Sequence, residues 1–192
     1  MEGNKGEMDM KTLILNGSPR KKGDTAFLQQ EFLAHLKGEY RVIHAYDGTI
    51  RPCIDCRYCW NNPGCSIQDG MQELYEEIQE ADNILIASPI FFSEISGPLL
   101  SVTSRLQTYF CGRVFRKEKP VPKAKKGGIL LIQGGDRPMD KGLDTVRELL
   151  AEMNAGMMGK PVCYKNSDRY PPDKHPELLE DVRQLARFFN EG

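Results

Sequence analysis

The segment Gly17-Ser-Pro-Arg-Lys-Lys-Gly-Asp-Thr25 decides the fold of this chain, because an apolar run precedes it and an amphipathic pattern follows it. Residues 12–15 predict a short buried strand, and residues 26–36 carry apolar side chains at helical spacing. A small, hydroxyl-rich loop at this junction places its backbone N–H groups at the positive end of a helix. The segment therefore predicts an anion site between the first strand and the first helix.

Side chains of this loop favour a mononucleotide phosphate as the anion. Ser18 and Thr25 offer hydroxyl groups, and Arg20 offers a charged fork that matches a phosphate. The loop lacks the Lys-Ser/Thr pair of an ATPase loop and the G-x-G-x-x-G spacing of a dinucleotide site. The alternative interpretation is an ordinary strand-to-helix turn rich in Ser, Gly and Pro.

Composition narrows the class of protein. The chain has 192 residues and a net charge of -1, which suits one α/β domain and provides no basic field for nucleic acid or an anionic membrane. Its apolar runs are of strand length, and residues 1–10 lack the hydrophobic core of a secretion signal. We expect a cytoplasmic protein whose six cysteines do not form a disulfide framework. We also expect a flexible tail at residues 1–9 and a single domain over 10–192, with a cysteine-rich loop at 51–70.

Predicted strands alternate with predicted helices, which indicates a doubly wound parallel sheet with helices on both faces. The strands are expected at 11–16, 40–46, 83–88, 128–133 and 161–165. The helices are expected at 25–37, 71–81, 98–110, 142–154 and 177–190. The first, third and fourth strands end in loops of small or turn-forming residues, and open α/β sheets bind ligands at such carboxyl ends. Loops of this kind at one edge of the sheet predict a cofactor site.

A C-x2-C-x2-C-x5-C array follows the second predicted strand and consists of Cys53, Cys56, Cys59 and Cys65. Spacing this compact lets one loop surround a cubic iron–sulfur cluster, and bacterial ferredoxins use the related C-x2-C-x2-C run. Structural zinc sites usually pair two C-x2-C knuckles on separate segments, and one redox-active pair would leave two thiols unexplained. The array favours a [4Fe–4S] cluster over zinc, a disulfide pair or unligated thiols.

Three segments together resemble the iron–sulfur flavoprotein branch of the NADPH-dependent FMN reductase family, within the flavodoxin-like superfamily. They are residues 15–25, the cysteine array leading into Asp69-Gly-Met71, and Ser88-Pro-Ile-Phe-Phe-Ser-Glu-Ile-Ser-Gly-Pro98. The resemblance implies a flavodoxin-like, three-layer α/β/α fold with a five-stranded parallel sheet in the order 2-1-3-4-5. It also implies a tightly bound FMN and a homodimer or homotetramer.

The resemblance assigns roles by position in this sequence. Residues implied to surround the FMN phosphate are Ser18, Arg20, Asp24 and Thr25. Residues implied to line the flavin ring are Pro89, Ile90, Phe91, Phe92 and Ser96, and those implied to close its far side are Gln133, Gly134, Gly135 and Asp136. Because neighbours in an extended segment point to opposite sides, we expect at most one of Phe91 and Phe92 to touch the flavin. The family commonly has Asn where this chain has Asp24, so we expect Asp24 to bind through its backbone N–H.

Together these features predict an oxidoreductase that carries FMN and a [4Fe–4S] cluster and transfers electrons between two-electron and one-electron partners. NAD(P)H is a candidate donor, the acceptor is a small molecule or a protein, and no protein acid or base is assigned. Two alternatives stay open. One is an NAD(P)H-dependent FMN or quinone reductase without a cluster, and the other is a non-enzymatic, flavodoxin-like electron carrier.

Overall fold

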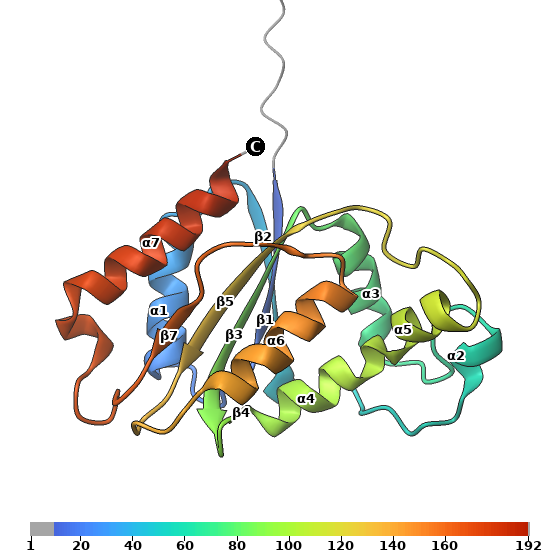
Figure 1. Cartoon of the computed structure of the whole chain (residues 1–192), viewed down its shortest axis with the longest axis horizontal. Helices are drawn as coiled ribbons and strands as arrows, with labels where there is room; N and C mark the ends of the chain where they lie inside the picture. The colour runs from blue at the N-terminus through green and yellow to red at the C-terminus, as the bar shows by residue number, and fades with distance from the viewer. Residues whose placement is uncertain (1–9, 192) are drawn as a thin grey trace, which may run out of the picture.

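The computed structural model describes residues 10–191, so the tail expected at residues 1–9 lies outside the described residues. A central sheet lies between two layers of helices (Figure 1). One layer consists of α1 (Asp24–Leu33) and α7 (Pro176–Asn190). The other layer consists of α3 (Met71–Glu80), α4 (Gly97–Thr103), α5 (Gln107–Val114) and α6 (Asp140–Glu152). No helix of this described part has the length and hydrophobicity needed to span a bilayer.

The main strands run parallel in the spatial order β2-β1-β3-β5-β6. β1 pairs with β2 and β3, and β3 pairs with β5. The bounds are β1 Lys11–Asn16, β2 Glu39–His44, β3 Asn83–Phe91, β4 Glu94–Ile95, β5 Lys126–Ile132, β6 Met157–Met158 and β7 Val162–Tyr164. The predicted parallel α/β architecture is therefore confirmed.

Side chains of the central strands alternate between the two helical layers. Ile14 of β1 packs in the core cluster that includes Leu28 of α1 and Phe189 of α7. Leu13 and Leu15, its neighbours in the strand, pack in the cluster on the other face. This alternation follows from the period of two in an extended chain. Both faces of β1 are thus buried, as the continuous apolar run predicted.

The predicted five-stranded sheet in the order 2-1-3-4-5 is wrong, because the sheet has seven strands. β4 turns back antiparallel on the end of β3, the strand expected at 161–165 is β7, and an unpredicted short strand, β6, also pairs with β5. Gly159-Lys-Pro161 separates β6 from β7. Pro161 has no N–H to donate to a ladder, so the outer strand cannot continue through it.

The single helix predicted at residues 98–110 is also wrong, because the 3₁₀ turn Ser104–Leu106 separates α4 from α5. Thr103 Oγ1 donates to Leu99 O at 2.8 Å, and Ser104 Oγ donates to Ser101 O at 2.6 Å. Hydroxyl groups that bond back to the helix backbone in this way bend helices. A further short helix, α2 (Tyr58–Asn61), lies inside the predicted cysteine loop.

Candidate functional site

The predicted phosphate loop lies at the carboxyl end of β1 and is fixed by Asn16. The Asn16 carboxamide accepts the N–H of Ser18 at 2.7 Å and donates to Gln29 of α1 at 2.5 Å. Ser18 Oγ accepts the N–H of Arg20 at 3.2 Å. These bonds set the path of the loop between strand and helix without using the exposed Arg20 side chain.

Helix α1 begins without a side-chain cap. Its N-cap residue, Gly23, has extended backbone angles and no side-chain cap hydrogen bond. The first N–H groups of a helix have no partner within the helix, so they are free to bind an anion. Asp24 and the buried Thr25 form the first turn, next to the loop that carries Ser18 and Arg20. The structure therefore gathers the four predicted phosphate residues around an uncapped helix terminus.

A buried hydroxyl group and a glycine mark the place where the pairing of β1 with β3 ends. A Cβ built on Gly17 would lie 2.7 Å from Ser88 Oγ and 2.8 Å from Ser96 Oγ, so a side chain there would displace both hydroxyl groups. Ser96 is 0% exposed, and its Oγ has no hydrogen-bond partner within residues 10–191. An unpaired buried hydroxyl group costs free energy, so this atom is suited to a ligand. The residues present here fit FMN.

The predicted ring-contact segment forms a hairpin between β3 and β4. Ile90 is buried, whereas Phe91 is 46% exposed and Phe92, at the tip, is 95% exposed. Phe92 and Ser93 both have positive φ, of 54° and 65°. The hairpin is fastened to α6, because the N–H of Gly142 donates to Ser93 O at 3.0 Å. A strained, anchored turn thus presents an exposed aromatic ring beside the loop.

The loop after β5 forms the third predicted wall of the site. The N–H of Gln133 donates to Tyr164 O at 2.8 Å, and the N–H of Asn166 donates to Gly135 O at 2.7 Å. The Asp168 carboxylate occupies the space that a Cβ of Gly134 would fill. Gln133 is buried, while Gly135 and Asp136 are exposed. The loop after β7 therefore supports the predicted wall from behind.

Two cavities lie at opposite edges of the sheet. One, of about 310 Å³, opens beside the phosphate loop and is lined in part by Asn16, Ser18 and Arg20. The larger, of about 970 Å³, lies where β1, β3 and β5 begin, and none of the predicted site residues line it. Its lysines Lys11 and Lys123 already form ion pairs within the protein. We therefore assign the candidate site to the edge with the smaller cavity.

The four cysteines of the array line one small cavity of about 20 Å³. All of them are free thiols. The loop that carries them leaves the carboxyl edge of the sheet and lies beside α5, at the end of the molecule far from α7 (Figure 1). Within residues 10–191 no three metal-ligating side chains are close enough to hold an ion. The donor set fits a cluster in its chemistry, but the thiols are not assembled into a metal site in this form.

Two of these thiols differ in how readily they ionise. Burial, together with the hydrogen bond and charge of the neighbouring Cys111 thiol, raises the pKa of Cys59 to about 12. A hydrogen bond from Ser66, at 3.1 Å, and the backbone of Tyr58 lower the pKa of the exposed Cys56. Cys56 therefore ionises more readily than Cys59.

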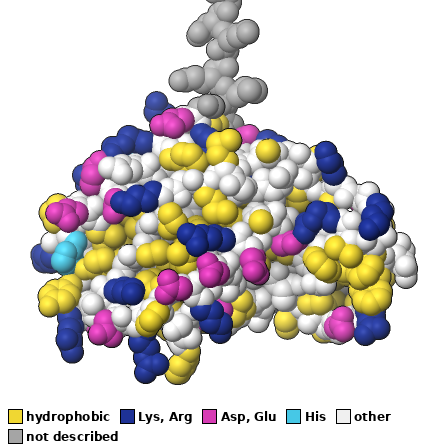
Figure 2. All heavy atoms as spheres, viewed as in Figure 1, with side chains coloured by type: hydrophobic (Ala, Val, Ile, Leu, Met, Phe, Trp, Pro, Cys, Tyr) yellow, Lys and Arg dark blue, Asp and Glu magenta, His cyan; other side chains and the backbone are white. Residues whose placement is uncertain are grey.

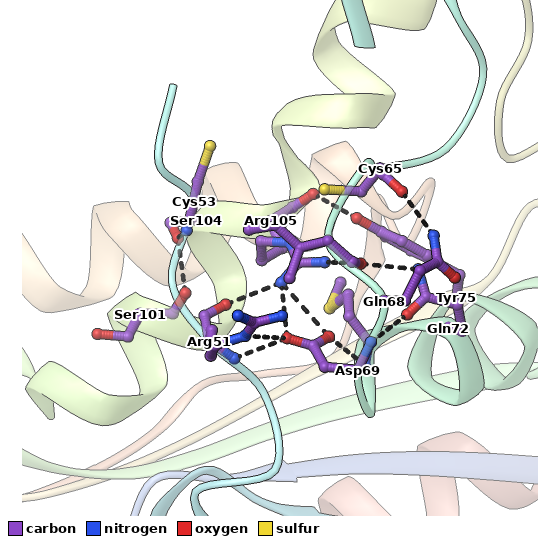
Figure 3. A network of polar contacts seen from close by, with 12 residues as sticks. Arg51, Cys53, Cys65, Gln68, Asp69, Gln72, Tyr75, Ser101, Ser104 and Arg105 are labelled. Carbon is purple, nitrogen blue, oxygen red and sulfur yellow. Dashed lines mark hydrogen bonds and ion pairs between the residues drawn. The ribbon is translucent and has the colours of Figure 1, made fainter. Parts of the chain in front are cut away.

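Sequence reasoning missed the residues that support the cysteine loop. Arg105 and Asp69 lie beneath it and form an ion pair at 3.1 Å (Figure 3). Burial alone would raise the pKa of Asp69, but N–H donors from Arg51 and Met71 and the Arg105 guanidinium hold this pKa below its usual value. Arg105 lies in a segment with helical periodicity, where an arginine normally indicates a solvated face.

Aromatic side chains surround the cysteine loop. Trp60 of α2 stacks on Phe115 with ring centroids 4.5 Å apart, and Arg57 lies 4.9 Å from the centroid of Trp60. Figure 2 shows hydrophobic side chains gathered at this end of the molecule. Both rings remain more than a third exposed. No sequence signal other than the aromatic residues themselves could have identified this cluster.

Comparison with known proteins identifies a family and several relatives of this chain. The family model for NADPH-dependent FMN reductase matches residues 10–168. An iron-sulfur flavoprotein of Methanocaldococcus jannaschii is 33% identical over 99 residues, which cover 50% of this chain and 51% of that protein. An iron-sulfur flavoprotein of Archaeoglobus fulgidus is 28% identical over 129 residues, which cover 66% of this chain and 56% of that protein. This chain thus spans little more than half the length of these two relatives.

Solved structures show the same fold at low sequence identity. The NAD(P)H:quinone oxidoreductase from Methanothermobacter marburgensis has a TM-score of 0.66 at 14% identity, covering 96% of this chain and 98% of that one. An azoreductase from Bacillus anthracis has a TM-score of 0.64 at 17% identity, covering 94% of this chain and 99% of that one. The family match and the named relatives together show that the chain belongs to the NADPH-dependent FMN reductase family of oxidoreductases, with the iron–sulfur flavoproteins as its relatives.

Proposed function

We propose that this protein is an FMN-binding oxidoreductase that carries a [4Fe–4S] cluster on Cys53, Cys56, Cys59 and Cys65. The observation that carries the flavin part is the uncapped start of α1 beside Gly17, together with the Ser96 hydroxyl group, which has no partner among residues 10–191. When bound, FMN would exchange two electrons with a donor such as NAD(P)H, and the cluster would exchange single electrons with a small-molecule or protein partner.

In this proposal the phosphate is held at the first turn of α1. Backbone N–H groups and the Thr25 hydroxyl group donate to it, and Arg20 turns inward to pair with its charge. The flavin ring lies against residues 89–92 of the hairpin, with Ser96 donating to a ring edge. Gln133, Gly134, Gly135 and Asp136 close the opposite side. Each charge-assisted contact contributes about 1.5–3 kcal/mol, so several together would retain the cofactor.

The cluster part of the proposal is supported by the shared cavity of the four thiols and by the names of the relatives. Because the phosphate loop lies toward α1 and the cysteine loop lies beside α5, the two centres occupy different parts of the molecule (Figure 1). In an assembly of two or four copies, electrons would pass between the flavin of one copy and the cluster of another copy whose cysteine loop approaches it.

A reductase without a cluster is the second candidate function. The narrowness of the cysteine cavity, about 20 Å³, favours it, since a cluster needs the loop to open. In that case the loop would shape the substrate pocket or a contact between copies.

The deciding measurement is an anaerobic absorbance spectrum with iron and sulfide assays, on the wild type and on Cys59→Ser. We expect flavin bands in both proteins, and a broad shoulder that dithionite bleaches in the wild type alone. Cys163→Ser is the matched control, because Cys163 is an exposed free thiol outside the array. Iron and sulfide near zero in the wild type would favour the second candidate, and a colourless protein that binds no added FMN would refute both.

A further inference from the structure

The 3₁₀ turn Ser104–Leu106 directs two consecutive side chains at the cysteine loop (Figure 3). Ser104 Oγ accepts the backbone N–H of Cys53 at 3.0 Å. Arg105 is 1% exposed, and its guanidinium lies between the two ends of the loop. The turn that interrupts the predicted helix thus carries the cation that contacts both ends of the cysteine loop.

Arg105 joins the chain before the first cysteine to the chain after the last. Its Nη1 donates to Arg51 O at 2.9 Å and to Asp69 Oδ2 at 3.1 Å. Its Nη2 donates to Ile67 O at 2.9 Å. Arg51 and Ile67 flank the four-cysteine array, so one guanidinium closes the whole loop.

Core stability alone does not explain this arrangement. A buried ion pair is rarely more stabilising than apolar side chains of the same volume, because both charges lose their hydration. The Arg105 Nε has no hydrogen-bond partner in the described part of the chain. The side chain of Cys65 lies near Arg105 (Figure 3). A deeply buried cation with an unused donor, next to a candidate ligand, indicates a role at the metal centre.

We propose that Arg105 is a positioning residue for the cluster: it fixes the two ends of the cysteine loop before metal binds and provides a buried positive charge beneath the thiolates. The inference rests on the proposed cluster. A cluster with four thiolate ligands is negatively charged, and each added electron makes it more so. Asp69 offsets part of the Arg105 charge, and the remaining field of the guanidinium favours cluster assembly and the reduced state.

The test compares Arg105→Gln, which removes the charge, with Arg105→Lys, which keeps the charge but loses the fork. Arg113→Gln is the matched control, because Arg113 lies on α5 and pairs with Glu152 outside the loop. Amide hydrogen exchange of residues 51–69 is measured in the metal-free proteins. Iron, sulfide and the cluster's midpoint potential are measured after anaerobic reconstitution, and FMN content reports whether each variant has folded.

We expect amide hydrogen exchange at residues 51–69 to be faster than in the wild type in both Arg105 variants, and to keep the wild-type rate in Arg113→Gln. Arg105→Gln should lose most of its iron and sulfide, and any remaining cluster should have a lower potential. Arg105→Lys should regain iron and a potential near that of the wild type. If Arg105→Gln kept wild-type exchange, iron content and potential, the role would be overturned while the cluster stood. If the wild-type protein took up no iron, both the proposed cluster and this role of Arg105 would be refuted. This outcome can be told apart from the previous one because it is measured on the wild type alone.

Discussion

Asp24 and Thr25 are neighbours in the first turn of α1, yet they should act on a bound phosphate in opposite directions. Thr25 is buried and can donate its hydroxyl group, whereas Asp24 brings a negative charge close to a dianion. We expect Thr25→Val to weaken FMN binding roughly tenfold, as the loss of about 1.4 kcal/mol implies, and Asp24→Asn to strengthen it. Quenching of FMN fluorescence measures both affinities. Equal affinities for the wild type and both variants would place the phosphate elsewhere.

Lys125 should make the stability of the protein depend on alkaline pH. It is 3% exposed, and burial together with the charge of Lys123 lowers its pKa from 10.5 to about 8. Between these two values the unfolded chain binds more protons than the folded protein, so the free energy of unfolding rises with pH. Below pH 8 Lys125 is protonated in both the folded and the unfolded state, so it no longer makes the free energy of unfolding depend on pH. The rise is at most about 3.4 kcal/mol, at 1.36 kcal/mol per unit of pKa difference.

Urea unfolding across this pH range, in the wild type and in Lys125→Met, measures the contribution. The variant should lose the rise, and Lys123→Met, at a more exposed position, should keep most of it. If the free energy of unfolding changed with pH in the same way in the wild type and in Lys125→Met, the pKa of Lys125 in the folded state would be that of an ordinary lysine.

Sequence reasoning located the loop residues whose placement depends on their immediate neighbours in the chain, and their role at a phosphate stays a prediction. Ser18 and Thr25 are examples, because a strand, a small loop and a helix start are all local signals. It missed Arg105, whose guanidinium contacts Arg51 and Asp69, which lie 54 and 36 positions away in the chain. It also missed Ser88, which lies beside Gly17 only because β1 and β3 are paired. Such contacts are set by the packed fold and leave no trace in local spacing.

The hairpin between β3 and β4 combines backbone strain with exposure. Phe92 and Ser93 occupy the left-handed region, which a two-residue turn normally fills with Asn-Gly. We expect the double variant Phe92→Asn with Ser93→Gly to raise the free energy of unfolding by about 1 kcal/mol. We also expect it to weaken FMN binding, because a ring that is 95% exposed has no packing role to justify the strain. Chemical unfolding without FMN and FMN titration measure the two effects.

Phe91→Ala is the companion variant, because only one of the two rings is expected to touch the flavin. Unchanged FMN affinity in the double variant with weakened binding in Phe91→Ala would assign the contact to Phe91, and unchanged affinity in both variants would remove both rings from the site.

Elements were predicted well where one physical signal dominates. β1 and β3 were found because both faces of each are buried, which leaves continuous apolar runs. The helix over 98–110 was predicted as one piece because its apolar spacing continues across the break. Backbone bonding by Thr103 and Ser104 hydroxyl groups interrupts it, and periodicity does not register such bonds.

Over the whole molecule, the phosphate loop lies toward α1 and the cysteine loop lies beside α5 (Figure 1), so we expect the two sites to be occupied independently. We expect FMN to slow amide exchange in residues 17–25 and in the β3–β4 hairpin, and iron with sulfide to slow it in residues 51–69. FMN at a hundredfold excess over its dissociation constant should also stabilise the folded chain by about 2.7 kcal/mol. Exchange measured after each addition alone tests this. FMN protection of residues 51–69 as strong as that given by iron would contradict it.

The divided outer strand has a consequence beyond this site. β6 is two residues long, and Gly159-Lys-Pro161 follows it, so this border of the sheet offers another polypeptide few aligned N–H and C=O groups. Met157 is 63% exposed there, and in a longer strand this apolar side chain would favour packing against another copy of the chain. A proline interruption at the margin thus discourages fibrils when many copies are crowded together.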